Sequence, residues 1–140
     1  MYFKTLLIPL FAQVVLTFLV LFILASQRLS ELKIRRINPQ KVDIRSRTQK
    51  VFEKAAAASD NLQNQFETPV LFYAAILLTM VLMVQDSVIV VMAWAYVVLR
   101  YIHCFIHLTN NKVTHRFAVF FVSVVALLTI WVRLGWLIIN

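Results

Sequence analysis

Five polar residues interrupt the apolar stretches of this sequence in two places, and their types suit ligand binding. Asn64 and Glu67 lie three residues apart at the start of one apolar stretch, and Arg100, His103 and His107 lie near the end of the next. Ionisable groups within apolar segments usually face the interior of a helix bundle or a wet cavity, where they pair with each other or with a ligand. The five side chains therefore predict a shared polar pocket.

The spacing of these residues places each group on one side of a helix. At about 100° per residue, Tyr96, Arg100, His103 and His107 fall within a wedge of roughly 60°. Residues three apart, as in the first pair, are neighbours on a helical surface. We expect the two polar faces to meet at one depth on adjacent helices.

Two further arginines make the cations outnumber the acids near this depth. Arg116 lies at the start of the last apolar stretch, and Arg28 follows the first. This excess predicts an anionic ligand, because guanidinium groups favour carboxylates and phosphates. The alternative is that the polar groups satisfy one another, with Glu67 pairing with Arg100 to fix the register of the helices.

A metal site is another alternative, because His103 and His107 have the H-x-x-x-H spacing that zinc and iron sites use. The chain holds only three histidines, of which His115 is the third. The neighbouring arginines would also repel a divalent cation. We therefore expect no metal at this place.

The composition predicts an all-α membrane protein. Of the 140 residues, 61% are hydrophobic and 14% are charged, whereas roughly 25% are charged in soluble proteins. The single glycine argues against a turn-rich β structure, and a helix satisfies its own backbone in lipid. The only cysteine, Cys104, lies within an apolar stretch and is predicted to pack in the core.

Four apolar stretches predict a four-transmembrane-helix bundle, since about 20 residues cross the hydrocarbon core of a membrane. The second run has only 16 residues from Pro69 to Val84, so we expect its helix to begin earlier, at Asn64. All the spans belong to a single domain, residues 1–140. The predicted spans are residues 5–25, 64–84, 88–108 and 116–139.

The first connection between spans is polar and strongly basic. Nine of the 14 Lys and Arg residues lie between Arg28 and Lys54. Because basic loops mark the cytoplasmic side of a membrane protein, topology explains this stretch better than nucleic-acid binding does. Both termini are then expected on the non-cytoplasmic side. We also expect the first span to continue as a polar helix to about Asn38-Pro39, and a second helix to run from residue 46 into the second span.

The chain resembles the MAPEG superfamily, the membrane-associated proteins of eicosanoid and glutathione metabolism, and is most similar to its small bacterial members. The segments that carry the resemblance are "NQFETPVLFY" in the second span and "RYIHCFIHLTNNKVTHR" between the third and fourth spans. The order of the spans and the polar first loop agree as well. The resemblance implies a homotrimer in a bacterial inner membrane, with glutathione sites between subunits on the cytoplasmic side.

The same resemblance implies roles for individual residues. Family members bind glutathione through an Asn-x-x-Glu motif, an arginine followed by polar residues three and seven positions later, and an arginine near the end of the first helix. The corresponding residues here are Asn64, Glu67, Arg100, His103, His107 and Arg28. Arg116 corresponds to a basic residue proposed to stabilise the thiolate, and it is therefore the candidate catalytic residue.

The implied activity is that of a glutathione-dependent transferase or peroxidase acting on lipophilic electrophiles or lipid hydroperoxides. His107 and Phe120 stand where transferase members have tyrosines, so a second function remains open. The alternative is a non-catalytic trimer that binds a lipid or an amphipathic anion in the groove between subunits. The expected partners are further copies of the chain, membrane lipids and a lipophilic small molecule.

Overall fold

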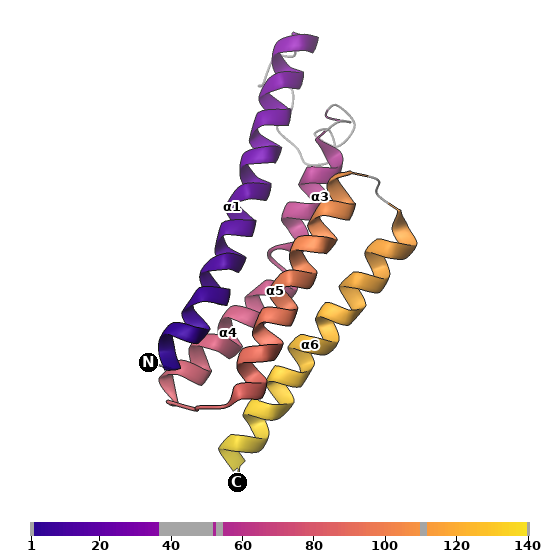
Figure 1. Ribbon diagram of the computed structural model, residues 1–140. Helices are drawn as coiled ribbons and strands as arrows, with labels where there is room; N and C mark the ends of the chain where they lie inside the picture. Colours follow the sequence, from indigo (N-terminus) through magenta and orange to yellow (C-terminus); the bar gives the residue numbers. More distant parts are fainter. Residues whose placement is uncertain (1, 37–51, 53–54, 110–111, 140) are drawn as a thin grey trace.

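Five helices account for most of the chain in the computed structural model, which describes residues 2–36, 52, 55–109 and 112–139. The prediction of an all-helical fold is confirmed for these residues. α5 packs against α1, α3 and α6, and the two ends of the chain lie at the same end of the bundle (Figure 1). The helices are α1 (Tyr2–Arg35), α3 (Ala56–Asn64), α4 (Thr68–Val81), α5 (Ser87–Leu108) and α6 (Val113–Ile139).

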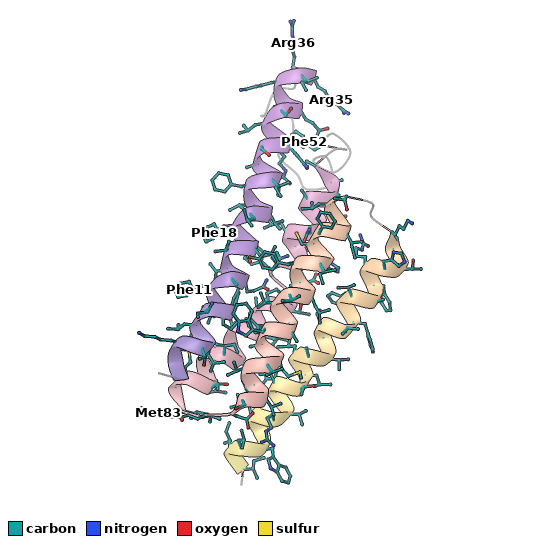
Figure 2. All side chains as sticks on the ribbon, viewed as in Figure 1. Phe11, Phe18, Arg35, Arg36, Phe52 and Met83 are labelled. Carbon is teal, nitrogen blue, oxygen red and sulfur yellow. The ribbon has the colours of Figure 1, made fainter. Side chains whose placement is uncertain are left out.

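The outer surface of the bundle is apolar over most of its length. Phe11, Phe18 and Phe22 on α1 are 59%, 56% and 74% exposed, and Figure 2 shows Phe11 and Phe18 pointing away from the other helices. Among the described residues, α1, α5 and α6 are each long and apolar enough to cross a membrane. Lipid solvates such a surface and water does not, so this is an integral membrane protein.

α1 continues beyond its apolar part as a polar helix, as predicted, and Figure 2 shows Arg35 and Arg36 at its far end. Glu31 in this extension is only 3% exposed. Its carboxylate accepts a hydrogen bond from the N–H of Ala55 at 3.3 Å and lies 3.8 Å from the guanidinium of Arg35. This carboxylate therefore ties the end of α1 to the beginning of α3.

The second predicted span is not one continuous helix, which corrects the sequence-based expectation. α3 ends at Asn64 and α4 begins at Thr68. α4 has 14 residues, so it is about 21 Å long and shorter than the ~30 Å hydrocarbon core. Pro69 supplies the reason, because within a helix its ring would clash with the carbonyl of Gln65 and it has no N–H to donate there.

Two other predictions concern residues outside the described part of the chain. The expected break at Asn38-Pro39 lies wholly outside it. The helix expected from residue 46 lies mostly outside it as far as residue 54, and its continuation is α3.

The largest apolar core lies between α1, α4, α5 and α6. Leu6, Phe72, Ile89 and Ile130 are 0% exposed within it. The ring of Phe72 stacks on Tyr96 with 4.6 Å between the centroids. This packing turns one face of α5 into the bundle and fixes the direction in which its polar residues point.

A tight connection joins α4 to α5, at the position that the sequence predicts. Met83 has a φ of +54°, in the left-handed region, and the N–H of Val84 donates to the carbonyl oxygen of Thr79 at 3.1 Å. This is the Schellman arrangement that ends many helices. Asp86 then caps α5, because its Oδ1 accepts from the N–H of Ile89 at 3.1 Å.

Asp86 also anchors α6. Its Oδ2 accepts from Nη2 and Nε of Arg133 at 2.9 and 3.0 Å. Partial burial raises the pKa of the Asp86 carboxyl, but the hydrogen bonds from Arg133 and from the N–H of Ile89, with the charge of Arg133, outweigh this effect. The pKa of Asp86 is therefore below its ordinary value.

Replacing Asp86 tests both of its contributions. Asp86→Asn keeps an N-cap acceptor and loses the charge, so we expect a loss of roughly 0.2–1 kcal/mol of stability. Asp86→Ala also loses the cap and should cost about 1 kcal/mol more. The stability that the ion pair adds is fully present above the ordinary carboxyl pKa of about 3.9. It is lost as the pH falls through the lower pKa of Asp86 in the folded state. Melting midpoints in detergent should therefore differ between wild type and Asp86→Asn at neutral pH and converge in acid; a constant gap would contradict the assignment.

Candidate anion-binding site

Arg100 is the most unusual side chain in the bundle, because it is a cation with 0% exposure. Its Nη2 donates to the carbonyl oxygen of Asn64 at 3.0 Å. Its guanidinium carbon lies 5.8 Å from the centroid of the Phe120 ring. Nε and Nη1 are buried with no hydrogen-bond partner among the described residues. A buried charge in this state is costly, so the site lacks an acceptor that a bound anion could supply.

His103 and His107 share the buried face of α5 with Arg100, as the spacing predicts. They are 3% and 2% exposed, and Tyr96 on the same face is 0% exposed. The two imidazole rings meet edge to face with 5.9 Å between their centroids. Nδ1 of His103 lies 3.2 Å from the carbonyl oxygen of Arg116. The buried Nε2 of His103 and Nδ1 of His107 have no partner in the described part of the chain.

A pocket of about 180 Å³ is lined by residues of α3, α5 and the first turns of α6. We call it the α6 pocket. Arg100 lies beside it, since it contacts Asn64 and Phe120, which both belong to the pocket wall. The pocket is lined by Asn64, His103, Val113, Arg116, Phe117 and Phe120.

The tertiary structure thus brings Asn64, His103 and Arg116 together at one pocket, with Arg100 and His107 adjoining it. Asn64 lines the pocket and contacts Arg100 through its backbone carbonyl. No group of three His, Cys, Asp or Glu side chains suited to a metal ion occurs within the described ranges.

Glu67 does not share a helical face with Asn64, which corrects the sequence-based expectation. Asn64 is the last residue of α3, and Glu67 precedes α4 after the break. The Glu67 side chain is exposed and its Oε1 accepts from Nε2 of Gln63 at 3.4 Å. The charge of Glu67 acts on the guanidinium of Arg100, although no direct ion pair joins the two among the described residues.

Arg28 does not line the α6 pocket. Its Nη2 donates to the hydroxyl of Ser59 at 3.4 Å, and its guanidinium carbon lies 5.9 Å from the centroid of the Phe52 ring. Arg28 therefore belongs to the contact between α1 and α3.

Sequence reasoning missed a buried chain of amides beside the site. Gln13 and Asn61 are 0% exposed and Gln65 is 1% exposed. Gln13 Nε2 donates to Gln65 Oε1 at 2.9 Å, and Gln65 Nε2 donates to Asn61 Oδ1 at 3.3 Å. Asn61 Nδ2 in turn lies 3.1 Å from the sulfur of Cys104, which is buried as predicted. Two signals could have revealed this chain: an isolated amide within the apolar part of α1, and the i,i+4 spacing of Asn61 and Gln65.

A sequence model of the MAPEG family matches residues 6–136, which is nearly the whole chain and includes every residue of the α6 pocket. No curated protein and no solved structure matches the sequence. The chain belongs to the MAPEG family.

Proposed function

We propose that this MAPEG protein binds glutathione at the α6 pocket and uses it as a transferase or peroxidase on lipophilic electrophiles or lipid hydroperoxides. The observation that supports this proposal best is the buried guanidinium of Arg100, whose Nε and Nη1 have no partner among the described residues. Glutathione carries two carboxylates, and a planar guanidinium is the side chain that binds a carboxylate most specifically. Because Arg100 is 0% exposed, a carboxylate reaches it only when a neighbouring side chain such as Phe120 moves.

Arg116 is the residue that we assign to the thiol. A free thiol has a pKa of about 8.5, and a nearby cation lowers it so that thiolate forms at neutral pH. Arg116 lines the pocket beside His103 and Phe120. In a transferase the thiolate sulfur then bonds to an electrophilic carbon as the bond from that carbon to its leaving group breaks. In a peroxidase it bonds to the outer oxygen of the hydroperoxide as the O–O bond breaks and the alcohol leaves. In both cases the protein contributes binding, orientation and charge.

A homotrimer with ligand sites between subunits would give Glu67 and Arg28 a role. Glu67 is exposed next to the break between α3 and α4, so it can meet the ammonium of a glutathione bound at this level. Arg28 would contribute its charge from the α1 of a neighbouring subunit. We place the pocket on the cytoplasmic side of a bacterial inner membrane, with both termini on the opposite side, because the basic end of α1, with Arg35 and Arg36, lies at the pocket end of the bundle (Figure 2).

A second function is supported by the pocket lining. Val113, Phe117 and Phe120 line it together with Arg116, and no tyrosine is among the described residues that line it. A hydroxyl group stabilises a thiolate by donating a hydrogen bond to it. An apolar wall beside a cation instead suits an amphipathic anion, whose charged head binds the cation and whose first carbons contact the wall. The alternative is therefore a non-catalytic trimer that binds a lipid or another amphipathic anion in this groove.

Thiol ionisation separates the two functions. Purified protein in detergent, titrated with glutathione at neutral pH, should show the ultraviolet absorbance of a thiolate. S-methylglutathione is the control ligand, because its thioether sulfur has no proton to lose. Glutathione binding without this absorbance would favour the non-catalytic function. If neither glutathione nor an anionic lipid binds, both proposals are wrong.

A further inference from the structure

The break between α3 and α4 frees the carbonyl group that holds Arg100. In a continuous helix the carbonyl of Asn64 would accept from the N–H four residues later. It instead accepts from Nη2 of Arg100 at 3.0 Å, because α3 ends at this residue. The orientation of the buried guanidinium therefore depends on the break.

Gln65 is the one residue of the break whose side chain is buried. Gln65 is 1% exposed, whereas Phe66 is 66% exposed and Glu67 is also exposed. The Gln65 amide uses both of its ends, accepting from Gln13 on α1 at 2.9 Å and donating to Asn61 on α3 at 3.3 Å. A single side chain thus connects the break to two helices.

The same chain of amides reaches α5 one turn away from Arg100. Asn61 Nδ2 lies 3.4 Å from the carbonyl oxygen of Cys104 and 3.1 Å from its sulfur. Cys104 follows Arg100 by four residues, and Asn61 precedes Asn64 by three. The hydrogen bond between Asn64 and Arg100 therefore lies within one turn of Asn61 on α3 and of Cys104 on α5, and these two residues form the end of the chain of amides.

We propose that Gln65 is a positioning residue that holds the guanidinium of Arg100 in place for an anionic ligand. This proposal rests on the proposed glutathione site. A buried amide with both ends bonded favours one geometry strongly, because any other leaves its partners unpaired. Loss of the Gln65 amide allows residues 65–67 to shift, and the carbonyl of Asn64 then moves away from Arg100.

A double-mutant cycle tests the coupling. Gln65→Met keeps the length of the side chain and removes its hydrogen bonds, so glutathione affinity, measured by calorimetry in detergent, should fall about tenfold. In the Arg100→Lys background, Gln65→Met should lower glutathione affinity by less than about twofold, because the guanidinium that Gln65 positions has already been replaced. If Gln65 has a purely structural role, Gln65→Met should lower glutathione affinity by the same factor in both backgrounds. Gln85→Met, at an exposed position in the connection between α4 and α5, is the matched control and should bind as wild type does.

A measurement without ligand separates this proposal from the proposed function. The Nε resonance of Arg100 in ¹⁵N-arginine-labelled protein, assigned with Arg100→Lys, should shift in Gln65→Met and not in Gln85→Met. An unshifted resonance, or unchanged affinity in Gln65→Met, overturns the positioning role. Wild-type protein that does not bind glutathione overturns the proposed function, while the resonance still decides the role of Gln65. Should Gln65→Met fail to fold, Gln13→Met removes only the α1 bond and should shift the same resonance by a smaller amount.

Discussion

Replacing Arg100 by methionine is expected to weaken glutathione binding by at least roughly 100-fold and to leave the protein folded. Truncating one partner of a buried charged contact costs about 3 kcal/mol or more, which corresponds to a loss of affinity of roughly 100-fold. Stability should respond in the opposite way. Without ligand, Arg100 is a fully buried cation with two unpaired nitrogen atoms, and apolar replacement of such a group is often neutral or stabilising by about 1–4 kcal/mol. Binding would be measured by calorimetry and stability by thermal melting in the same detergent.

Two matched variants make this result specific. Arg100→Lys keeps the charge and loses the planar fork, so it should bind with an affinity between those of wild type and Arg100→Met. Arg133→Met removes a cation at the opposite end of the bundle, where it pairs with Asp86 at 2.9 Å. It should melt at a lower temperature and bind glutathione normally, which is the reverse pattern. If Arg100→Met unfolds the protein while affinity for glutathione in Arg100→Lys is unchanged, Arg100 has a structural role and the anion site is wrong.

Replacing Arg116 by methionine should remove the thiolate while changing glutathione affinity much less. A positioned cation that stabilises a reacting anion contributes about 10²–10³-fold to the rate, so we expect a loss of this order in transferase turnover at neutral pH. The absorbance of bound thiolate should disappear in parallel. Because the missing charge raises the pKa of the bound thiol, part of the lost rate should return at alkaline pH, where the thiol ionises without help.

The backbone around Arg116 should survive this change. His103 Nδ1 lies against the carbonyl oxygen of Arg116 at 3.2 Å, and this contact does not involve the side chain. Arg116→Lys, which retains a cation, is the control and should keep most of the absorbance. Equal turnover in wild type and Arg116→Met would remove Arg116 from the chemistry, and absence of turnover in all three proteins would favour the non-catalytic function.

Much of the fold was predictable because it depends on local periodicity. The polar face of α5 follows directly from the helical repeat, and the four residues that define it are at most 3% exposed: Tyr96, Arg100, His103 and His107. The apolar outer faces of α1, α5 and α6 follow in the same way from their composition. The resemblance to the MAPEG superfamily was likewise visible in the sequence, and the match to the family model confirms it.

The second helical segment was predicted incorrectly because its geometry is not local. Pro69 can start a helix or kink one, and periodicity does not distinguish the two. The structure selects a break, in which Gln65 bonds to Gln13, a residue 52 positions earlier. Glu67 is consequently exposed, and Asn64 reaches Arg100 through its carbonyl.

The sequence by itself determined the helices α1, α5 and α6, their membrane environment and which face of α5 is polar, because a helical repeat within a few turns specifies these properties. Only the tertiary structure decided which polar groups meet. The burial of Arg100 beneath Phe120, its bond to the carbonyl of Asn64 and the amide chain behind them join α1, α3, α5 and α6. Such contacts depend on how distant helices pack, and no spacing within one segment encodes them.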